Sequence, residues 1–156
     1  MFYSFSSNFA DGLLPQGSLI QASDGNLYGA MGGGAFGAGA VMKFTLTGTE
    51  SVFYSFSGGG DGLVGSSDGG SPAGDLLQAS DGNFYGMTTA GGAINAGTVF
   101  KITPAGTESV LHSFGSFPGD GRFPGGNLIQ ASDGNLYGET GQGGAYNLGT
   151  VIQIIR

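Results

Sequence analysis

Carboxylates, amides and aromatic side chains recur at matched positions along this chain, and together they could bind sugars. Three of the carboxylates, Asp11, Asp68 and Asp120, stand in Asp-Gly pairs or beside other turn residues. Stacking on aromatic rings and hydrogen bonding to carboxylates and amides suit a neutral glycan. The pattern predicts a carbohydrate-binding face made of Asp11, Phe36, Asp68, Asn95, Asp120, Arg122, Phe123, Tyr146 and Asn147.

Catalytic chemistry has less support in the sequence. Asp-Gly pairs are common in tight turns, so the same aspartates have a structural interpretation. The single histidine, His112, aligns with Tyr3 and Tyr54 in an internal repeat, which favours packing over a role as a base. No serine lies in a nucleophile-elbow motif, and no His, Asp and Glu set has metal-ligand spacing. We therefore expect a non-enzymatic protein without metal or cofactor, the alternative being a glycoside hydrolase with two axial aspartates.

Charge and composition exclude several classes of partner. The chain has 156 residues, with 11 acidic and 4 basic side chains and a net charge of −7. No Lys/Arg cluster is present, so the basic surface of a nucleic-acid-binding protein is missing. The absence of cysteine excludes disulfides and thiol catalysis. No apolar run reaches the ~20 residues of a membrane span, and the start lacks the features of an export signal.

One stretch organises the rest of the chain, because it returns almost unchanged. Leu-Ile-Gln-Ala-Ser-Asp-Gly-Asn-Leu-Tyr-Gly at 19–29 recurs at 76–86 and at 128–138. Two extended runs joined by Asp-Gly predict a β-hairpin with a type I′ turn, in which both central residues have positive φ. Hairpins are therefore expected at 18–30, 75–87 and 127–139.

Each repeat of about 52 residues contains four short strands. A third strand follows Gly39, Gly97 and Gly149, and an aromatic-rich fourth strand occupies 52–57 and 110–115, with a counterpart at 1–6. Lys43 with Glu50, and Lys101 with Glu108, are expected to pair across the turn between them. This plan is that of an all-β propeller with four-stranded antiparallel blades. The blades are predicted at 18–57, at 75–115, and at 127–156 with strand 1–6.

The positions of the chain ends suggest how the blades close. Arg156 aligns with Pro104 and Met1 with Val52, so both ends fall in the turn before the fourth strand. Three blades are fewer than the four to eight of typical propellers. We expect a homodimer in which exchanged strands 1–6 complete a six-bladed ring. A homotrimer with nine blades, a closed three-bladed monomer and a fragment of a longer array are the alternatives.

The repeated motifs resemble those of a known family. The run ASDGNLYG or ASDGNFYG, then GTVFKIT and GTES, then LHSF or FYSF, is similar to the GloVer-type tandem repeat of bacterial proteins. The resemblance covers essentially the whole chain. It implies a β-propeller-like array in a secreted or cell-surface parent protein, and it implies no activity. The changing loop tips on the constant frame then indicate a binding surface, and a purely structural module is the alternative.

Overall fold

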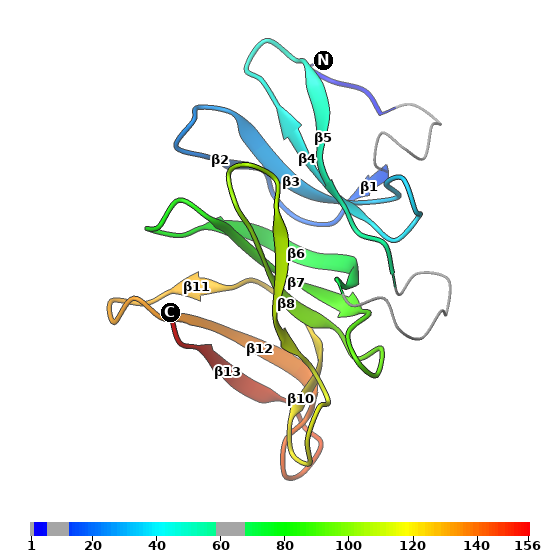
Figure 1. The fold of residues 1–156 in the computed structure, drawn as a ribbon, viewed down its shortest axis with the longest axis vertical. Coiled ribbons are helices and arrows are strands. Elements are labelled where there is room, and N and C mark those ends of the chain that lie inside the picture. The colour runs from blue at the N-terminus through cyan, green and yellow to red at the C-terminus, as the bar shows by residue number, and fades with distance from the viewer. Residues whose placement is uncertain (1, 6–12, 59–67) are drawn as a thin grey trace.

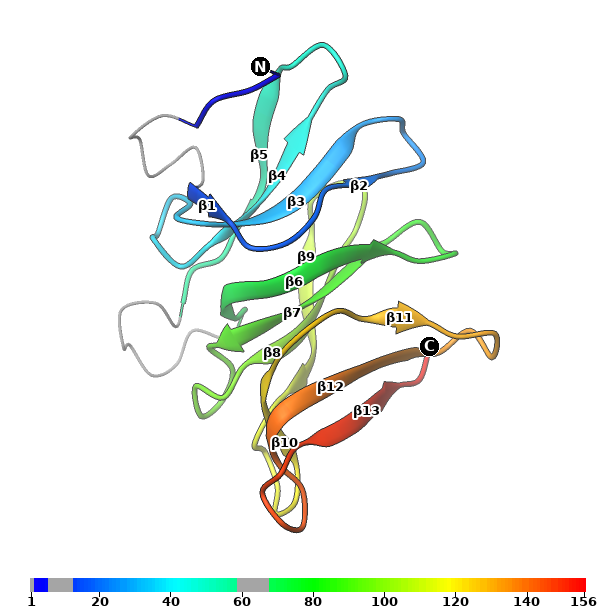
Figure 2. The same ribbon diagram turned by 180° about the vertical axis from the view of Figure 1, so that it is seen from behind.

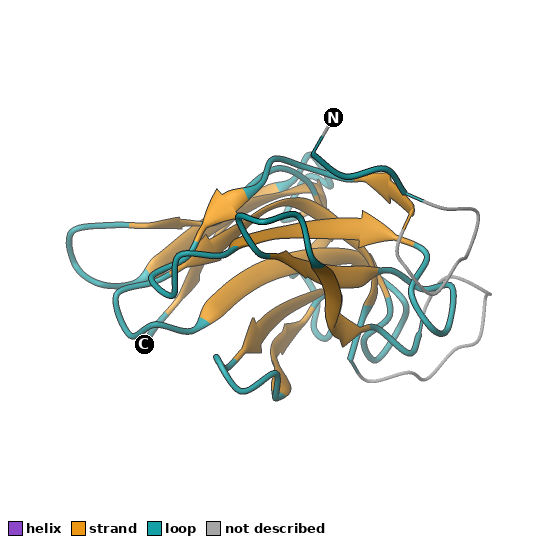
Figure 3. Cartoon of the chain, turned by 90° about the horizontal axis from the view of Figure 1, so that it is seen from above, coloured by secondary structure: helices purple, strands orange, loops and turns teal. Residues whose placement is uncertain are grey.

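The computed structural model describes residues 2–5, 13–58 and 68–156. This part of the chain consists of strands and loops without any helix (Figure 3). It accordingly holds no helix long and apolar enough to cross a membrane. Three antiparallel sheets lie side by side in a row (Figure 1), and we call them blade 1, blade 2 and blade 3.

The blades share one strand order, in which sequence neighbours lie next to one another. Blade 1 contains β1 (Leu13–Pro15), β2 (Ile20–Gln21), β3 (Leu27–Gly32), β4 (Ala40–Phe44) and β5 (Glu50–Ser55). Blade 2 contains β6 (Gly70–Gln78), β7 (Phe84–Ala90), β8 (Thr98–Ile102) and β9 (Glu108–Ser113). Blade 3 contains β10 (Gly121–Pro124), β11 (Ile129–Gln130), β12 (Leu136–Gly143) and β13 (Thr150–Ile154). Because β1 and β2 both pair with β3 and together form the first strand of blade 1, the predicted four-stranded antiparallel plan is confirmed in blades 1 and 2.

The first strand of each blade begins earlier than the sequence predicted. The hairpins were predicted to begin at residues 18 and 127, but residues 13–15 already lie in β1, and Arg122 and Phe123 lie in β10. These strands pair with β3 and β12, and Leu14, Ser71 and Phe123 have positive φ directly before a proline. The irregularity at this point divides the first strand into two parts in blades 1 and 3. Proline is tolerated there because the first strand is a sheet edge and the missing N–H breaks no ladder.

The Asp-Gly hairpins form where predicted, with a different turn. Gly25 has a φ of +82°, whereas Asp24 does not have positive φ. The Gly25 N–H donates to Ala22 O, and the Ala22 N–H donates to Asn26 O, both at 2.9 Å. This is a three-residue hairpin in which a type I turn is followed by a left-handed glycine. The expected type I′ turn is therefore wrong, although glycine is still required at its last position.

The core lies between the blades. Val41 and Phe56 of blade 1 pack against Phe100 and Ile102 of blade 2, and all four are almost inaccessible to solvent. A second cluster joins Val99 and Phe114 of blade 2 to blade 3. Full burial of each such side chain contributes about 1.5–3 kcal/mol. Since no blade buries its faces by itself, each depends on a neighbour for stability.

Candidate functional site

The long loops emerge along one side of the row of blades. Gly70 at the start of β6 faces Ala90 at the end of β7, and Thr98 at the start of β8 faces Ser113 at the end of β9. The Asp-Gly hairpins project from the other side, at the left in Figure 1. The described members of the predicted glycan site therefore share one side of the molecule. Asp11 lies outside the described residues.

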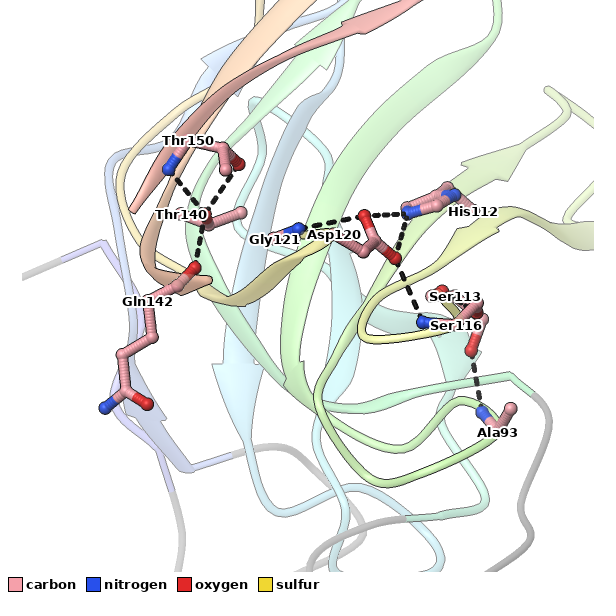
Figure 4. Close-up of polar contacts among 9 residues, drawn as sticks. All are labelled: Ala93, His112, Ser113, Ser116, Asp120, Gly121, Thr140, Gln142 and Thr150. Carbon is pink, nitrogen blue, oxygen red and sulfur yellow. Dashed lines mark hydrogen bonds and ion pairs between the residues drawn. The ribbon is translucent and has the colours of Figure 1, made fainter. Parts of the chain in front are cut away.

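Asp68 and Asp120 hold the loop between one blade and the next. Asp68 accepts hydrogen bonds from the Tyr54 hydroxyl at 2.8 Å and the Ser57 N–H at 2.9 Å. Asp120 is buried, and both of its carboxylate oxygens lie 3.1 Å from His112 Nε2 (Figure 4). It also accepts from the N–H groups of Ser116 and Gly121. Asp68 and Asp120, which the sequence analysis assigned to a glycan site, therefore already have hydrogen-bond partners within the protein.

His112 and the serines around it do not form a nucleophilic triad. Ser113 Oγ accepts the Ala93 N–H at 2.7 Å, and Ser116 Oγ donates to the Ser113 carbonyl (Figure 4). Tyr54 takes the place of His112 in blade 1 and makes the corresponding bond to an aspartate. A tyrosine in the same role shows that the contact holds a loop and needs no base. Among the described residues, no group of three or more His, Asp or Glu could hold a metal ion.

The two predicted amides also have structural partners. Asn95 Oδ1 accepts the Gly91 N–H at 2.7 Å, and Asn147 Oδ1 accepts the Gly143 N–H at 3.0 Å. Both asparagines have positive φ, near +56°, a conformation that asparagine tolerates better than most residues. They close the glycine-rich loops between the second and third strands of blades 2 and 3.

Aromatic side chains at the loop tips are exposed. Phe36 is 65% exposed and Tyr146 is 87% exposed, and Phe123 is also accessible. A groove of about 520 Å³ lies nearby, and it brings together three predicted residues, Asp120, Arg122 and Asn147. Residues 115–119, which the sequence analysis did not single out, line the same groove. Phe36 belongs to blade 1 and is not part of it.

The hairpin aspartates form polar networks of their own. The predicted pairing of Lys43 with Glu50 is wrong, because Lys43 Nζ lies 2.9 Å from Asp24 and Glu50 accepts from Tyr3. The prediction considered only residues that face each other across the hairpin of β4 and β5. The partner of Lys43 lies instead in the turn between β2 and β3. Asp81, in the hairpin of blade 2, pairs at 2.6 Å with Arg156, which follows β13 of blade 3. Although burial opposes it, hydrogen bonds from Tyr85 and Asn83 and the Arg156 charge lower the pKa of Asp81 to about 2.

Glu108 was not identified from the sequence as a residue with a shifted pKa. Its Oε1 is buried without a hydrogen-bond partner among the described residues. Burial, together with the charge of Asp68, raises the pKa of Glu108 to about 7. Because this is above the ordinary value, 4.5, the protonated form stabilises the fold. That stability is complete below pH 4.5 and is lost as the pH rises through about 7.

We therefore expect Glu108→Gln to raise the thermal midpoint at pH 8 and to leave it almost unchanged at pH 4.5. Since Glu108 is about half buried, solvent screening limits the gain at pH 8 to about 1–2 kcal/mol. Calorimetry of the wild type and the variant between pH 4.5 and 8.5 measures it. Glu50→Gln, at the matching position of blade 1, is the control. Equal pH profiles for the wild type and Glu108→Gln would contradict the assignment.

Blade 3 presents an uncovered apolar face and an unpaired strand edge. Val41 and Val99, at matching positions of blades 1 and 2, have no solvent exposure, whereas Val151 in β13 is 80% exposed. Leu148, where the other blades have buried alanines, is 87% exposed. In the described part of the chain, β13 pairs with β12 and has no strand on its other side. A flat apolar strand edge of this kind is a template for pairing with another chain.

The strand order and the packing of sheets on sheets define an all-β repeat protein of the β-propeller type. Residues 63–156 match the Gloeobacter/Verrucomicrobia repeat, and the chain belongs to this family. No curated protein matches it at a significant level. A crystal structure provisionally described as a gluconolactonase is similar over 79% of this chain and 40% of its own, with 19% identity and a TM-score of 0.52. The chain thus spans less than half of that protein, and the likeness concerns the fold.

Proposed function

We propose that this chain is a non-catalytic β-propeller module that assembles with a second copy into a six-bladed ring. The observation that carries the proposal is the contrast between Val151, which is 80% exposed, and Val41 and Val99, which are fully buried. Each of the two buried valines is covered by the blade that follows its own. Blade 3 has a valine at the same position, so this side of the blade suits contact with a further blade, although Glu139 replaces the buried Met87 of blade 2.

Blade 1 supplies the complementary surface. Its outward side carries Met42 and Phe44, which are covered by Tyr3 and Phe5 from the start of the chain. Met42 and Phe44 align with Phe100 and Ile102 of blade 2. Those two residues form the surface of blade 2 against which blade 1 packs. The two ends of the row therefore differ and fit each other, as a head-to-tail assembly requires. Two copies place six blades in the ring, within the range of four to eight.

Absolute mass in solution tests the ring. Light scattering after size exclusion should give about 31 kDa, twice the 15.5 kDa chain, at micromolar concentration. A species of three times the chain mass would replace the six-bladed ring by one of nine blades. A stable 15.5 kDa species at all concentrations would refute assembly.

Carbohydrate binding is a second candidate function, favoured by the exposed ring of Tyr146 beside the groove of Arg122 and Asn147. A sugar stacked on that ring would suit the exported location that the repeat implies. A glycan array should give a hit that Tyr146→Ala weakens about tenfold, the loss of a stacking contact. Leu46→Ala, an exposed change in a turn between the third and fourth strands, is the control. A blank array would contradict this candidate.

A further inference from the structure

The N-terminal segment already lies where the fourth strand of a preceding blade would lie. The rings of Tyr54 and Phe56, in the fourth strand of blade 1 and directly after it, are 5.1 Å apart, and Phe56 packs on blade 2. Tyr3 and Phe5 repeat this arrangement, 5.2 Å apart, and Phe5 packs on the outward side of blade 1. Residues 2–5 nevertheless belong to none of the three sheets. The packing of Tyr3 and Phe5 therefore matches that of a fourth strand, although residues 2–5 pair with no blade of their own chain.

The vacant place for a fourth strand is at the other end of the row. A groove of about 280 Å³ runs along the free edge of β13 and is lined by Thr150–Ile154 with His112 and Phe117. The N-terminus and β13 lie at opposite ends of the molecule (Figures 1 and 2). Residues 2–5 cannot occupy this groove in their own chain while Phe5 stays packed on blade 1. A second copy can supply them while its own Phe5 stays packed on its blade 1.

Building on the proposed ring, we infer that the β13 edge is an acceptor site for the N-terminal segment of a second copy, with Tyr3 opposite Val151 and Ser4 opposite Thr150. The register comes from the two complete blades. Val41 pairs with Tyr54 in blade 1, and Val99 pairs with His112 in blade 2. The next pairs are Ala40 with Ser55, and Thr98 with Ser113.

Two hydrogen bonds that repeat in blades 1 and 2 support this register. The serine of the fourth strand accepts a loop N–H, from Ala35 to Ser55 and from Ala93 to Ser113 (Figure 4). In blade 3 the corresponding loop residue is Ala145, which Ser4 of the partner would reach. The next residue donates its N–H to a glycine carbonyl, Phe56 to Gly39 and Phe114 to Gly97, both at 3.0 Å. By the same alignment, the N–H of the second copy's Phe5 would donate to the Gly149 carbonyl.

Contacts between neighbouring blades extend the same pattern to the inner strands. The Ser23 N–H donates to Gln78 Oε1 at 2.7 Å, and the Ser80 N–H donates to Gln130 Oε1 at 2.9 Å. By the same alignment, the Ser132 N–H would donate to Oε1 of Gln21 of the second copy. Backbone bonds repeat likewise, from Ser71 N to Ala38 O and from Phe123 N to Ala96 O. The next bond joins the second copy's Leu14 to Leu148.

Cysteine cross-linking tests the register, since the chain contains no native cysteine. Ser4→Cys with Thr150→Cys places the thiols on directly paired residues, within the range of a disulfide. The matched control, Ser4→Cys with Ile154→Cys, moves the second thiol four residues along β13, roughly 13 Å away. After mild oxidation, non-reducing electrophoresis should show most of the first variant as covalent dimer and little of the second.

Each other outcome overturns the inference. Equal cross-linking of both variants would show that no fixed register exists, and a disulfide within one chain would show that the segment closes its own blade. Absence of cross-linking in a species of about 31 kDa would leave the proposed ring intact and refute strand exchange. A 15.5 kDa species without cross-links would refute both the proposed ring and the strand exchange. Ser4 is exposed, whereas Thr150 bonds to Thr140 and Ile154 packs on the second core cluster, so circular dichroism of both variants checks that they fold.

Discussion

Replacing Gly97 by alanine should destabilise the protein by at least about 3 kcal/mol. Gly97 has a φ of +96°, which side chains rarely tolerate. An added Cβ would lie 2.2 Å from the Thr88 carbonyl oxygen and 2.8 Å from Pro124 Cδ. Both neighbours are constrained, one by the β7 ladder and the other by the proline ring in the next blade. The chain therefore needs glycine where blades 2 and 3 approach each other.

Gly125→Ala is the matched control, because Gly125 has no positive φ and no heavy atom within 4 Å of an added Cβ. Its free energy of unfolding should change by under about 0.5 kcal/mol. Urea denaturation followed by circular dichroism measures both variants. For a domain of this size, the loss at Gly97 corresponds to a fall in melting temperature of about 6–12 °C. Equal midpoints for the two variants would contradict the close packing of the blades.

The repeat made the blade plan predictable, because three copies with the same spacing fix the order of the strands. The turn type was not predictable from the Asp-Gly pair alone. Whether Asp24 adopts positive φ depends on which residues close the hairpin, and the bond from Ala22 to Asn26 decides this. The first strands were placed too late because Pro15 and Pro124 resemble loop residues until their edge position is known.

Which residues of the proposed glycan site already have hydrogen-bond partners was not predictable from the sequence, for a related reason. A single sequence shows that Asp120 and Asn147 could bind a ligand, but it does not show which groups they already satisfy. The structure places His112 against Asp120 and the Gly143 N–H against Asn147. Loops of this kind close on themselves because buried polar groups must be paired. The aromatic side chain of Tyr146 has no such requirement, and it is exposed.

Val151→Asp should abolish the proposed ring and leave each chain folded. Val151 is 80% exposed in one chain, so the substitution should change the stability of the single chain by about 0.5 kcal/mol or less. In the ring, the aspartate would be buried without a partner at the position of Val41 and Val99. An unpaired buried charge costs about 3–5 kcal/mol, which weakens assembly at least 100-fold. Light scattering should then give 15.5 kDa where the wild type gives twice that mass.

Two further variants make the result specific. Leu46→Asp introduces the same charge at an exposed position in the turn between β4 and β5, and should leave the mass unchanged. Glu139 is the charged residue of the uncovered face, standing where blade 2 has buried Met87. Glu139→Met restores the apolar pattern, so it should strengthen assembly and lower the concentration at which dimers form. If Val151→Asp and Leu46→Asp weakened assembly equally, net charge and not the β13 edge would control it.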